Sequence, residues 1–537
     1  MKSLIAFLSD KKPWLAGATA VLIAGLLVAH VWYLKHAIPP APTVKPERAA
    51  ILDRAGNILA ANEVTYSLWI NPGTFLAPCK ADGCQVCPRH ASRIAPLLAA
   101  LADTPAIQAS VRAKLTNGRQ YLPSQRFIYL AYHASPSMVA KLKPLQLPGL
   151  NWEPSQKRRY PEGPLFAHAL GFTVKDSSGK GLEGLEWAAD RRLRTEADAA
   201  GKIAPLRTTL DSALQTKARN ALQATLQHHP TWAGAVVIAD ARTGAVLSMV
   251  SAPDFDPNVE TSFRNPLRQD RILNNAVANA FPLEGLIAPL LVAQALNEHV
   301  IMPETRFAQG STVAELTRNP TPTATALLLR EMRPQSNYAY LDRLGFGLDL
   351  QMPGISQGVY GDLTDWRDWS PAKHATLGHE VRANLIQILQ AYQPLATDGR
   401  MHRLRLIATP DADNCLPEAP PSQDCARVVS PETAATMRRL LAAGGTHAVI
   451  ATLSSLPHNH SQPGTRAIRI GMTPADAPRY LVGVLLHNRS GGRNTLMPTT
   501  TALFNTLIDQ LDNAQDRAFA HGRATRLPSM KATQANV

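Results

Sequence analysis

Three Ser-x-x-Lys strings are the feature of this sequence whose residue types and spacing could support nucleophilic catalysis. They run from Ser9 to Lys12, from Ser177 to Lys180 and from Ser370 to Lys373. A serine at the start of a helix and a lysine at i+3 share one helical face, where the amine can help to deprotonate the hydroxyl. Of the three, only Ser370 is followed by a proline, which suits the first position of a helix. Because such strings arise easily by chance in a long chain, Ser370 is a candidate to test and not an assigned nucleophile.

Two further serines have histidines close by in sequence. Ser454 and Ser455 are followed by His458 and His460, and a histidine within hydrogen-bonding reach of a serine can act as its general base. The alternative is a polar, proline-bearing loop whose histidines have no chemical role, and the sequence favours this simpler interpretation.

The five cysteines are compatible with disulfide or metal chemistry. Cys415 and Cys425 flank a proline-rich loop and form a possible disulfide, which an oxidising compartment would preserve. A second group has a spacing that resembles a zinc knuckle and consists of Cys79, Cys84, Cys87 and His90. One disulfide with a leftover thiol is the favoured alternative for these three cysteines. The sequence does not determine which two of them would pair. We expect neither a metal nor a cofactor.

Length and charge narrow the possible functions. A chain of 537 residues is long enough for more than one domain. It contains 55 Lys and Arg against 41 Asp and Glu, for a net charge of +14. The basic residues are dispersed, and the longest uninterrupted block is Lys157-Arg158-Arg159. This pattern favours a solvated, mildly basic surface, leaves wall polymer or anionic headgroups as possible partners, and does not predict nucleic-acid binding.

An apolar run near the N-terminus predicts a membrane anchor. Residues 14–34 are long enough to cross a bilayer as one helix, and Lys2, Lys11 and Lys12 precede them, which favours a cytoplasmic N-terminus at residues 1–13. The run is too long for the apolar part of a signal peptide, although a cleaved export signal is the alternative. Prolines make residues 35–47 a stiff linker. We therefore expect a single-pass protein of the inner membrane with most of the chain in the periplasm.

Beyond the linker, short landmarks recur in a fixed order. Residues 48–60 alternate around an Asp-Arg-x-Gly turn, which predicts strand, turn and strand. Arg159-Tyr160-Pro161, His168 and Gly181-Leu182-Glu183-Gly184 follow. None of these motifs is specific by itself. Together they are specific, because they occur in a fixed order over more than a hundred residues.

The second half of the chain predicts a sheet flanked by helices. Asp211 or Ser212 is a suitable N-cap for an amphipathic helix that continues through Leu226. Residues 235–251 form a hairpin pattern, and a second pair of strands is expected at residues 467–471 and 479–487.

Together these landmarks resemble the class B penicillin-binding proteins, septal and elongation D,D-transpeptidases. The resemblance implies an α+β chain with an N-terminal transmembrane helix, an elongated β-rich pedestal and a transpeptidase domain of the serine β-lactamase type. The domains expected are the N-terminus (1–13), the anchor (14–34), the linker (35–47), the pedestal or dimerisation domain (48–205), the transpeptidase-like domain (206–511) and a polar tail (512–537).

The resemblance also locates three motifs, and each departs from the family pattern. Gly285 and Ala288 stand where the family has its nucleophilic Ser and the Lys one turn later. Gln335 replaces the serine of the Ser-x-Asn motif, whereas Asn337, which would hold the substrate, is present. Where the family has Lys-Thr-Gly or Lys-Ser-Gly, which binds the substrate carboxylate, the strand alignment gives Leu453, Ser454 and Ser455.

These departures suggest a degenerate site. We expect a chain that is not an enzyme and that acts as a scaffold or regulator in peptidoglycan synthesis or cell division. Its expected partners are division or wall-synthesis proteins, such as a polytopic glycosyltransferase. Two alternatives are an active D,D-transpeptidase or carboxypeptidase with a relocated nucleophile, and a module that binds stem peptides of peptidoglycan through Asn337.

Overall fold

The computed structural model is divided into two units, residues 1–47 and residues 48–537, and the description below concerns the second. No helix among the described residues is both long and apolar enough to cross a bilayer, and the anchor expected at 14–34 lies outside them. The described ranges are 48–75, 88–116, 127–174, 179–195, 204–259, 270–278, 280–308, 310–346, 381–408, 426–456, 464–490 and 495–524.

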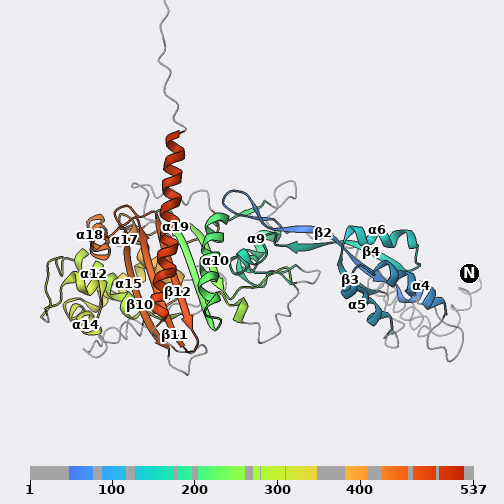
Figure 1. The fold of residues 1–537 in the computed structure, drawn as a ribbon, viewed down its shortest axis with the longest axis horizontal. Coiled ribbons are helices and arrows are strands. Elements are labelled where there is room, and N and C mark those ends of the chain that lie inside the picture. The colour runs from blue at the N-terminus through green and yellow to red at the C-terminus, as the bar shows by residue number, and fades with distance from the viewer. Residues whose placement is uncertain are drawn as a thin grey trace, which may run out of the picture. The chain divides into compact units, whose positions relative to one another are not determined.

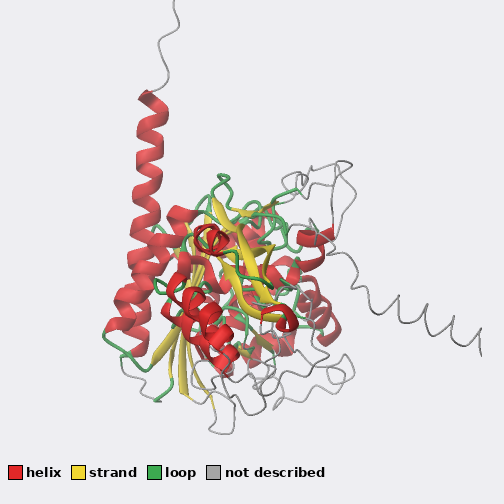
Figure 2. Ribbon diagram, turned by 90° about the vertical axis from the view of Figure 1, so that its right-hand side faces the viewer, coloured by secondary structure: helices red, strands yellow, loops and turns green. Residues whose placement is uncertain are grey.

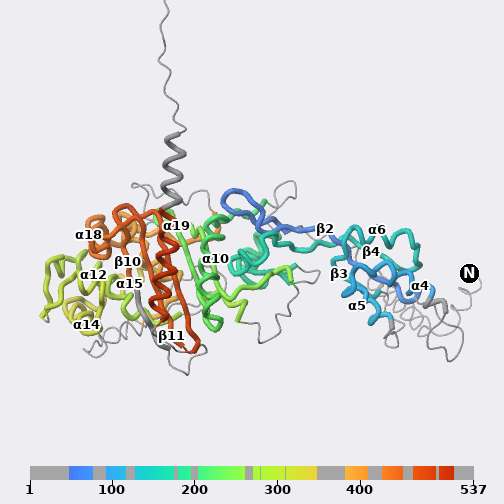
Figure 3. The backbone as a smooth tube through the Cα atoms, in the orientation of Figure 1, coloured from blue at the N-terminus to red at the C-terminus, as the bar shows by residue number. Residues whose placement is uncertain are grey.

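A five-stranded antiparallel sheet forms the centre of the C-terminal domain, by which we mean the described residues from 204 onward. Its strand order is β10-β11-β12-β6-β7, so that segments far apart in sequence lie side by side (Figure 3). The predicted hairpin is confirmed as β6 and β7, and the predicted second pair as β11 and β12. The strands are β6 (Trp232–Asp240), β7 (Val246–Ala252), β10 (Ala448–Leu456), β11 (Gly464–Thr473) and β12 (Tyr480–Asn488).

Helices α10 (Ser212–Gln227) and α19 (Leu496–Ala524) cover one face of this sheet (Figure 1). The predicted N-cap is Asp211, whose carboxylate accepts hydrogen bonds from the backbone N–H groups of Ala213 and Leu214. Helix α19 continues to Ala524, into the segment that we expected to be a polar tail. Alanine and arginine are frequent in that segment and have high helix propensity.

A layer of helices covers the other face (Figure 2). Its central helix is α12, whose residues are buried from Ala288 to Leu296. Helix α17 begins with a capping box in which Asn384 accepts from the N–H of Gln387, and the Gln387 side chain accepts from the N–H of Asn384. The elements on this side are β8 (Phe281–Pro282), η4 (Glu284–Ile287), α12 (Ala288–Asn297), α13 (Val313–Arg318), α14 (Pro322–Glu331), α15 (Pro334–Arg343), β9 (Arg382–Ala383), α17 (Leu385–Ala396) and α18 (Pro431–Ala442).

The N-terminal domain, residues 48–195, is built around the long strand β2 (Ile58–Ile70), which pairs with β4 (Leu150–Arg159) along most of its length. At the far end of this ribbon, β3 and helices α4 to α6 surround a separate apolar core. The other elements are β1 (Ile51–Leu52), α3 (Pro72–Phe75), α4 (Pro88–Ala100), α5 (Pro105–Thr116), β3 (Ile128–Ala134), α6 (Pro136–Leu142), η2 (Lys143–Leu145), η3 (Gly163–Phe166), α7 (Ala167–Leu170), α8 (Gly184–Ala188) and α9 (Asp190–Thr195), with β5 (Leu206–Arg207) pairing in parallel to β1.

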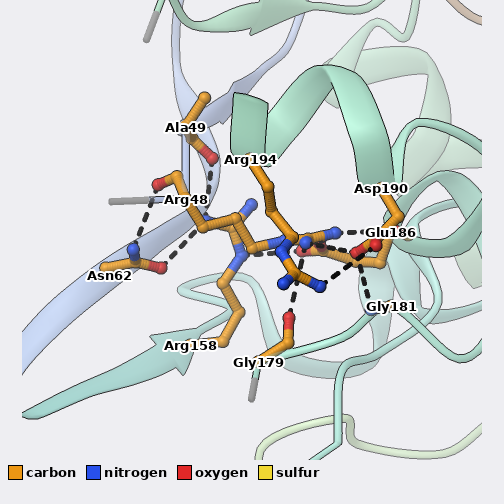
Figure 4. Close-up of polar contacts among 9 residues, drawn as sticks. All are labelled: Arg48, Ala49, Asn62, Arg158, Gly179, Gly181, Glu186, Asp190 and Arg194. Carbon is orange, nitrogen blue, oxygen red and sulfur yellow. Dashed lines mark hydrogen bonds and ion pairs between the residues drawn. The ribbon is translucent and has the colours of Figure 1, made fainter. Parts of the chain in front are cut away.

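Buried ion pairs stabilise the end of the β2–β4 ribbon that is opposite to β3 (Figure 4). Glu186, which is fully buried, accepts from Arg48 at 2.6 Å and from Arg158 at 2.7 Å. The Arg48 guanidinium also donates to Asp190 at 2.6 Å. Buried charges are costly unless they are paired. These contacts therefore fix the position of Arg48, and with it the start of the N-terminal domain.

Candidate active site

Gly285 and Ala288 lie at the start of helix α12, where the sequence comparison placed them. Gly285 belongs to the 3-10 turn η4 and is half-buried, whereas Ala288 is the first residue of α12 and is fully buried. The residue before the glycine, Glu284, has a left-handed backbone with φ of 46°. Non-glycine residues in this region are strained and tend to cluster at functional sites.

Contacts from other parts of the domain hold this turn. The hydroxyl of Tyr392 donates to the carbonyl of Leu286 at 2.6 Å, and burial raises the pKa of Tyr392 well above its ordinary value. Strand β8 pairs with β9 just before the turn, and β10 contacts η4 from the sheet. The backbone around Gly285 is therefore positioned by residues more than 90 positions away in the chain.

Asn337 lies within helix α15, three residues after Pro334, which occupies the first helical position. Its side chain is fully buried, and neither Nδ2 nor Oδ1 has a hydrogen-bond partner among the described residues. Gln335 is exposed. Ser336 faces away, towards the end of α12, where its hydroxyl donates to Glu298 at 2.5 Å.

Strand β10 carries Leu453, Ser454 and Ser455, which pair with Ala467, Arg466 and Thr465 of β11. The side chains of these three β10 residues lie outside the description. Strand β10 contacts η4, and α12 contacts α15, so the elements that carry the three motifs are in contact with one another.

Arg466 was missed in the sequence, although an arginine in an apolar strand is an unusual residue. It is buried, and its guanidinium carbon lies 6.0 Å from the centroid of the Phe281 ring. Burial, together with the charge of Arg382, lowers the pKa of Arg466 to about 10. A second cation, Arg382, donates to the carbonyl of Ala280 at 3.3 Å. Two arginines therefore lie close to the residues that precede η4.

Several other candidates cannot be placed. Ser370 with Lys373, the loop containing His458 and His460, and all five cysteines lie outside the described residues. His90 is in helix α4, but its side chain is not described. Within the described ranges, no group of three or more His, Cys, Asp or Glu residues is arranged to hold a metal ion.

Comparison with known families identifies this architecture. The model of the "Penicillin-binding Protein dimerisation domain" matches residues 43–201, and that of the "Penicillin binding protein transpeptidase domain" matches residues 234–509, more than half of the chain. The chain belongs to the penicillin-binding proteins, as a member of class B.

Individual relatives agree with this assignment. "Probable peptidoglycan D,D-transpeptidase PenA" of Neisseria meningitidis is 28% identical over 438 residues, 71% of this chain and 70% of the relative. "Probable peptidoglycan D,D-transpeptidase PbpC" of Pseudomonas aeruginosa is 24% identical over 518 residues, 86% of this chain and 84% of the relative. "Peptidoglycan D,D-transpeptidase FtsI" of Escherichia coli is 25% identical over 397 residues, 66% of this chain and 63% of the relative.

A solved structure, described as a peptidoglycan synthetase from Bifidobacterium adolescentis, has the same fold. It is 18% identical, with a TM-score of 0.61, and the match covers 87% of this chain and 96% of that one.

These matches overturn the expectation that the chain is not an enzyme. The transpeptidase-domain model matches the whole region around the site, and the relatives are named as peptidoglycan D,D-transpeptidases. That expectation was wrong because it rested on the identity of a few side chains, chiefly Gly285 and Ala288, which is too narrow a basis for classifying a domain of this size.

Proposed function

We propose that this chain functions in peptidoglycan synthesis, as a transpeptidase-class protein whose site recognises the peptide stems of the wall. The names of the relatives and the domain match support this class of substrate. In the family pattern described above, the asparagine at position 337 holds the substrate.

The observation that carries the proposal is the state of Asn337. Leaving a buried polar group unsatisfied costs about 1–3 kcal/mol, and natural structures rarely retain such groups without a reason. Asn337 presents an unpaired donor and an unpaired acceptor among the described residues. A peptide bond offers the complementary acceptor and donor, so a bound stem peptide would satisfy both atoms.

Acyl transfer sets a further requirement. The step needs a hydroxyl that attacks the peptide carbonyl and a base that accepts its proton. Glycine at 285 and alanine at 288 supply neither, so an acyl-enzyme in this chain would form on a hydroxyl elsewhere. Ser370 is the candidate with a lysine at the required spacing.

A second candidate role is that of a scaffold or regulator in wall synthesis or cell division. The match of the dimerisation-domain model to residues 43–201 favours this additional role, because a domain outside the transpeptidase domain can hold a partner. We propose that residues 14–34 anchor the chain in the inner membrane, with the folded domains in the periplasm. The partners proposed are division or wall-synthesis proteins, such as a polytopic glycosyltransferase.

Two measurements on the purified full-length protein test these proposals. Calorimetry should detect binding of a synthetic stem peptide ending in D-Ala-D-Ala, and Asn337→Ala should weaken binding at least tenfold. Absence of binding at millimolar peptide would refute substrate recognition.

Fluorescent penicillin separates the two candidate roles. A covalent band that maps to a serine by peptide mass spectrometry, and that disappears in the corresponding alanine variant, would establish acyl transfer. Peptide binding without a band, together with recovery of wall-synthesis proteins from membranes, would favour the scaffold role.

A further inference from the structure

We infer that four aromatic side chains of the N-terminal domain form a binding surface for the glycan strands of peptidoglycan, which are β-1,4-linked chains of N-acetylated amino sugars. This surface, called the aromatic strip below, consists of Trp69, Phe127, Tyr129 and Tyr132. The inference goes beyond the proposed function, because it concerns the sugar part of the wall polymer and a domain outside the transpeptidase domain.

Strand register places the aromatic strip on the face of the sheet opposite to the apolar core. Trp69 of β2 is the direct partner of Tyr129 of β3, whereas its sequence neighbours Leu68 and Ile70 are buried in the core. Successive residues of a strand point to opposite faces. One extra residue of β3 lies between the partners of Trp69 and Leu68, so that Tyr132 returns to the face of Tyr129. Helices α4 to α6 contribute their apolar residues to the core on the other face.

The rings of the aromatic strip contact one another in a row. The ring centroids of Trp69 and Phe127 are 6.2 Å apart and those of Phe127 and Tyr129 are 5.9 Å apart, both edge-to-face. Tyr129 and Tyr132 are stacked at 5.1 Å. Phe127 is 51% exposed and Tyr132 is 45% exposed. Cross-strand pairing explains the contact of β2 with β3, but contiguous exposed apolar surface is typical of an interaction site.

The size of the aromatic strip favours a narrow ligand. A large aromatic side chain has about 150–250 Å² of surface to bury, so four partly exposed rings offer roughly 400 Å² or less. A stable protein–protein interface takes about 800 Å² from each partner. A sugar chain needs much less surface, because the C–H groups on the flat side of one β-linked sugar stack on the negatively polarised face of one ring.

A polar group beside the rings favours a sugar over a proline-rich peptide, which is another common ligand of aromatic surfaces. The hydroxyl of Tyr129 donates to Glu153 at 2.8 Å. Burial, together with this hydrogen bond, raises the pKa of Tyr129 to about 12, so the phenol keeps its proton at neutral pH. The phenol oxygen and the carboxylate therefore present acceptors. Sugar hydroxyls donate to such acceptors, whereas prolines have no N–H group.

The test uses the full-length protein and chitohexaose, a soluble β-1,4-linked hexamer of N-acetylglucosamine. We expect calorimetry to detect binding by the wild type, and saturation-transfer NMR to locate the contact at the sugar C–H protons. Tyr132→Ala and Phe127→Ala should each weaken binding about fivefold, because a stacking surface is lost. Tyr132→Phe should retain most of the affinity. Glu153→Gln should weaken binding about threefold, because a charged acceptor is lost.

Trp187→Ala is the matched control. Trp187 is 54% exposed and lies in α8 of the same domain, outside the aromatic strip, so its replacement should leave chitohexaose binding unchanged. Thermal melts of Tyr132→Ala and Phe127→Ala should match the wild type, because both side chains are half-exposed. Maltohexaose, whose α-linked glucose units form a curved chain, should bind more weakly than chitohexaose.

The outcomes separate this inference from the proposed function. Absence of binding at millimolar chitohexaose, or full affinity in folded Tyr132→Ala and Phe127→Ala, would overturn the glycan surface. Equal binding of maltohexaose would overturn the assignment to β-linked amino sugars, and binding of a proline-rich peptide without binding of chitohexaose would contradict it as well. Stem-peptide binding through Asn337 is measured separately, so that either proposal can fail while the other stands.

Discussion

Asn337 and Asn384 show how the same side chain can be placed for different purposes. Both are fully buried. The amide of Asn384 caps helix α17 and also donates to the carbonyl of Val277, so its hydrogen-bonding capacity stabilises the fold. The amide of Asn337 contributes no such bond among the described residues. This difference is what the proposed role of Asn337 in peptide binding predicts.

This contrast gives a prediction. Asn337→Leu should leave the free energy of unfolding unchanged or raise it by about 1–3 kcal/mol, because it removes two unsatisfied buried atoms, and it should abolish binding of the stem peptide. Asn384→Leu, the control, should lower the free energy of unfolding by about 1–2 kcal/mol through loss of the cap. Urea denaturation measures both, and a strong loss of stability in Asn337→Leu would show that its amide is structural.

At the scale of elements, the buried ion pairs of Glu186 connect four segments. Arg48 precedes β1, Arg158 is in β4, Glu186 is in α8, and Asp190 begins α9. Helices α8 and α9 have only 5 and 6 residues and would not be stable in isolation. The ionic contacts, not intrinsic helix propensity, therefore determine how the base of the N-terminal domain is assembled.

Removing the negative charge of Glu186 should therefore lower the free energy of unfolding strongly. Glu186→Gln leaves the guanidinium groups of Arg48 and Arg158 buried without a carboxylate between them, and we expect a loss of about 3–5 kcal/mol in unfolding free energy. Arg194→Ala, which removes a partly exposed partner of Asp190, should cost less than about 1 kcal/mol. Denaturant titrations of the two variants should differ accordingly, and similar midpoints would contradict a structural role for Glu186.

Local patterns predicted some elements well and others poorly. The hairpin of β6 and β7 and the Asp211 cap depend on neighbouring residues, and the sequence was sufficient for both. The position of Arg466 over Phe281 was not predictable, because it depends on pairing between strands separated by long stretches of chain. The extension of α19 was missed because polar composition was given more weight than helix propensity.

At the scale of the whole molecule, His168 joins the two domains. It belongs to α7 of the N-terminal domain, and it packs edge-on against Phe255 of the C-terminal domain, with ring centroids 5.2 Å apart. Its Nε2 donates to the carbonyl of Arg271 at 2.8 Å. Burial lowers the pKa of His168 to about 4, and the contact with the Arg271 carbonyl opposes this shift only in part. The buried interface between the two domains therefore favours the neutral form of the His168 imidazole.

Acidification should weaken this interface. The unfolded chain, in which the histidine has an ordinary pKa near 6.5, binds the proton more readily than the folded chain. Stability is therefore lost as the pH falls from about 6.5 towards 4, by at most about 1.4 kcal/mol per pH unit. His168→Gln should remove this component, which is measured as the difference in the pH dependence of unfolding between variant and wild type. If the unfolding free energies of the variant and the wild type depended on pH in the same way, His168 would not titrate in this range.

The two-stranded ribbon of β2 and β4 has a practical consequence for protein engineering. Between Glu63–Lys157 and Thr65–Ser155 the strands pair with each other, and the register with β3 begins only at Tyr66. Two residues that face each other in an antiparallel pair can be joined by a short turn. The part of the N-terminal domain beyond this position, which contains β3 and helices α3 to α6, could therefore be excised and replaced by a hairpin. It could also be exchanged for the corresponding part of a relative, while the ion pairs at the other end of the ribbon remain in place.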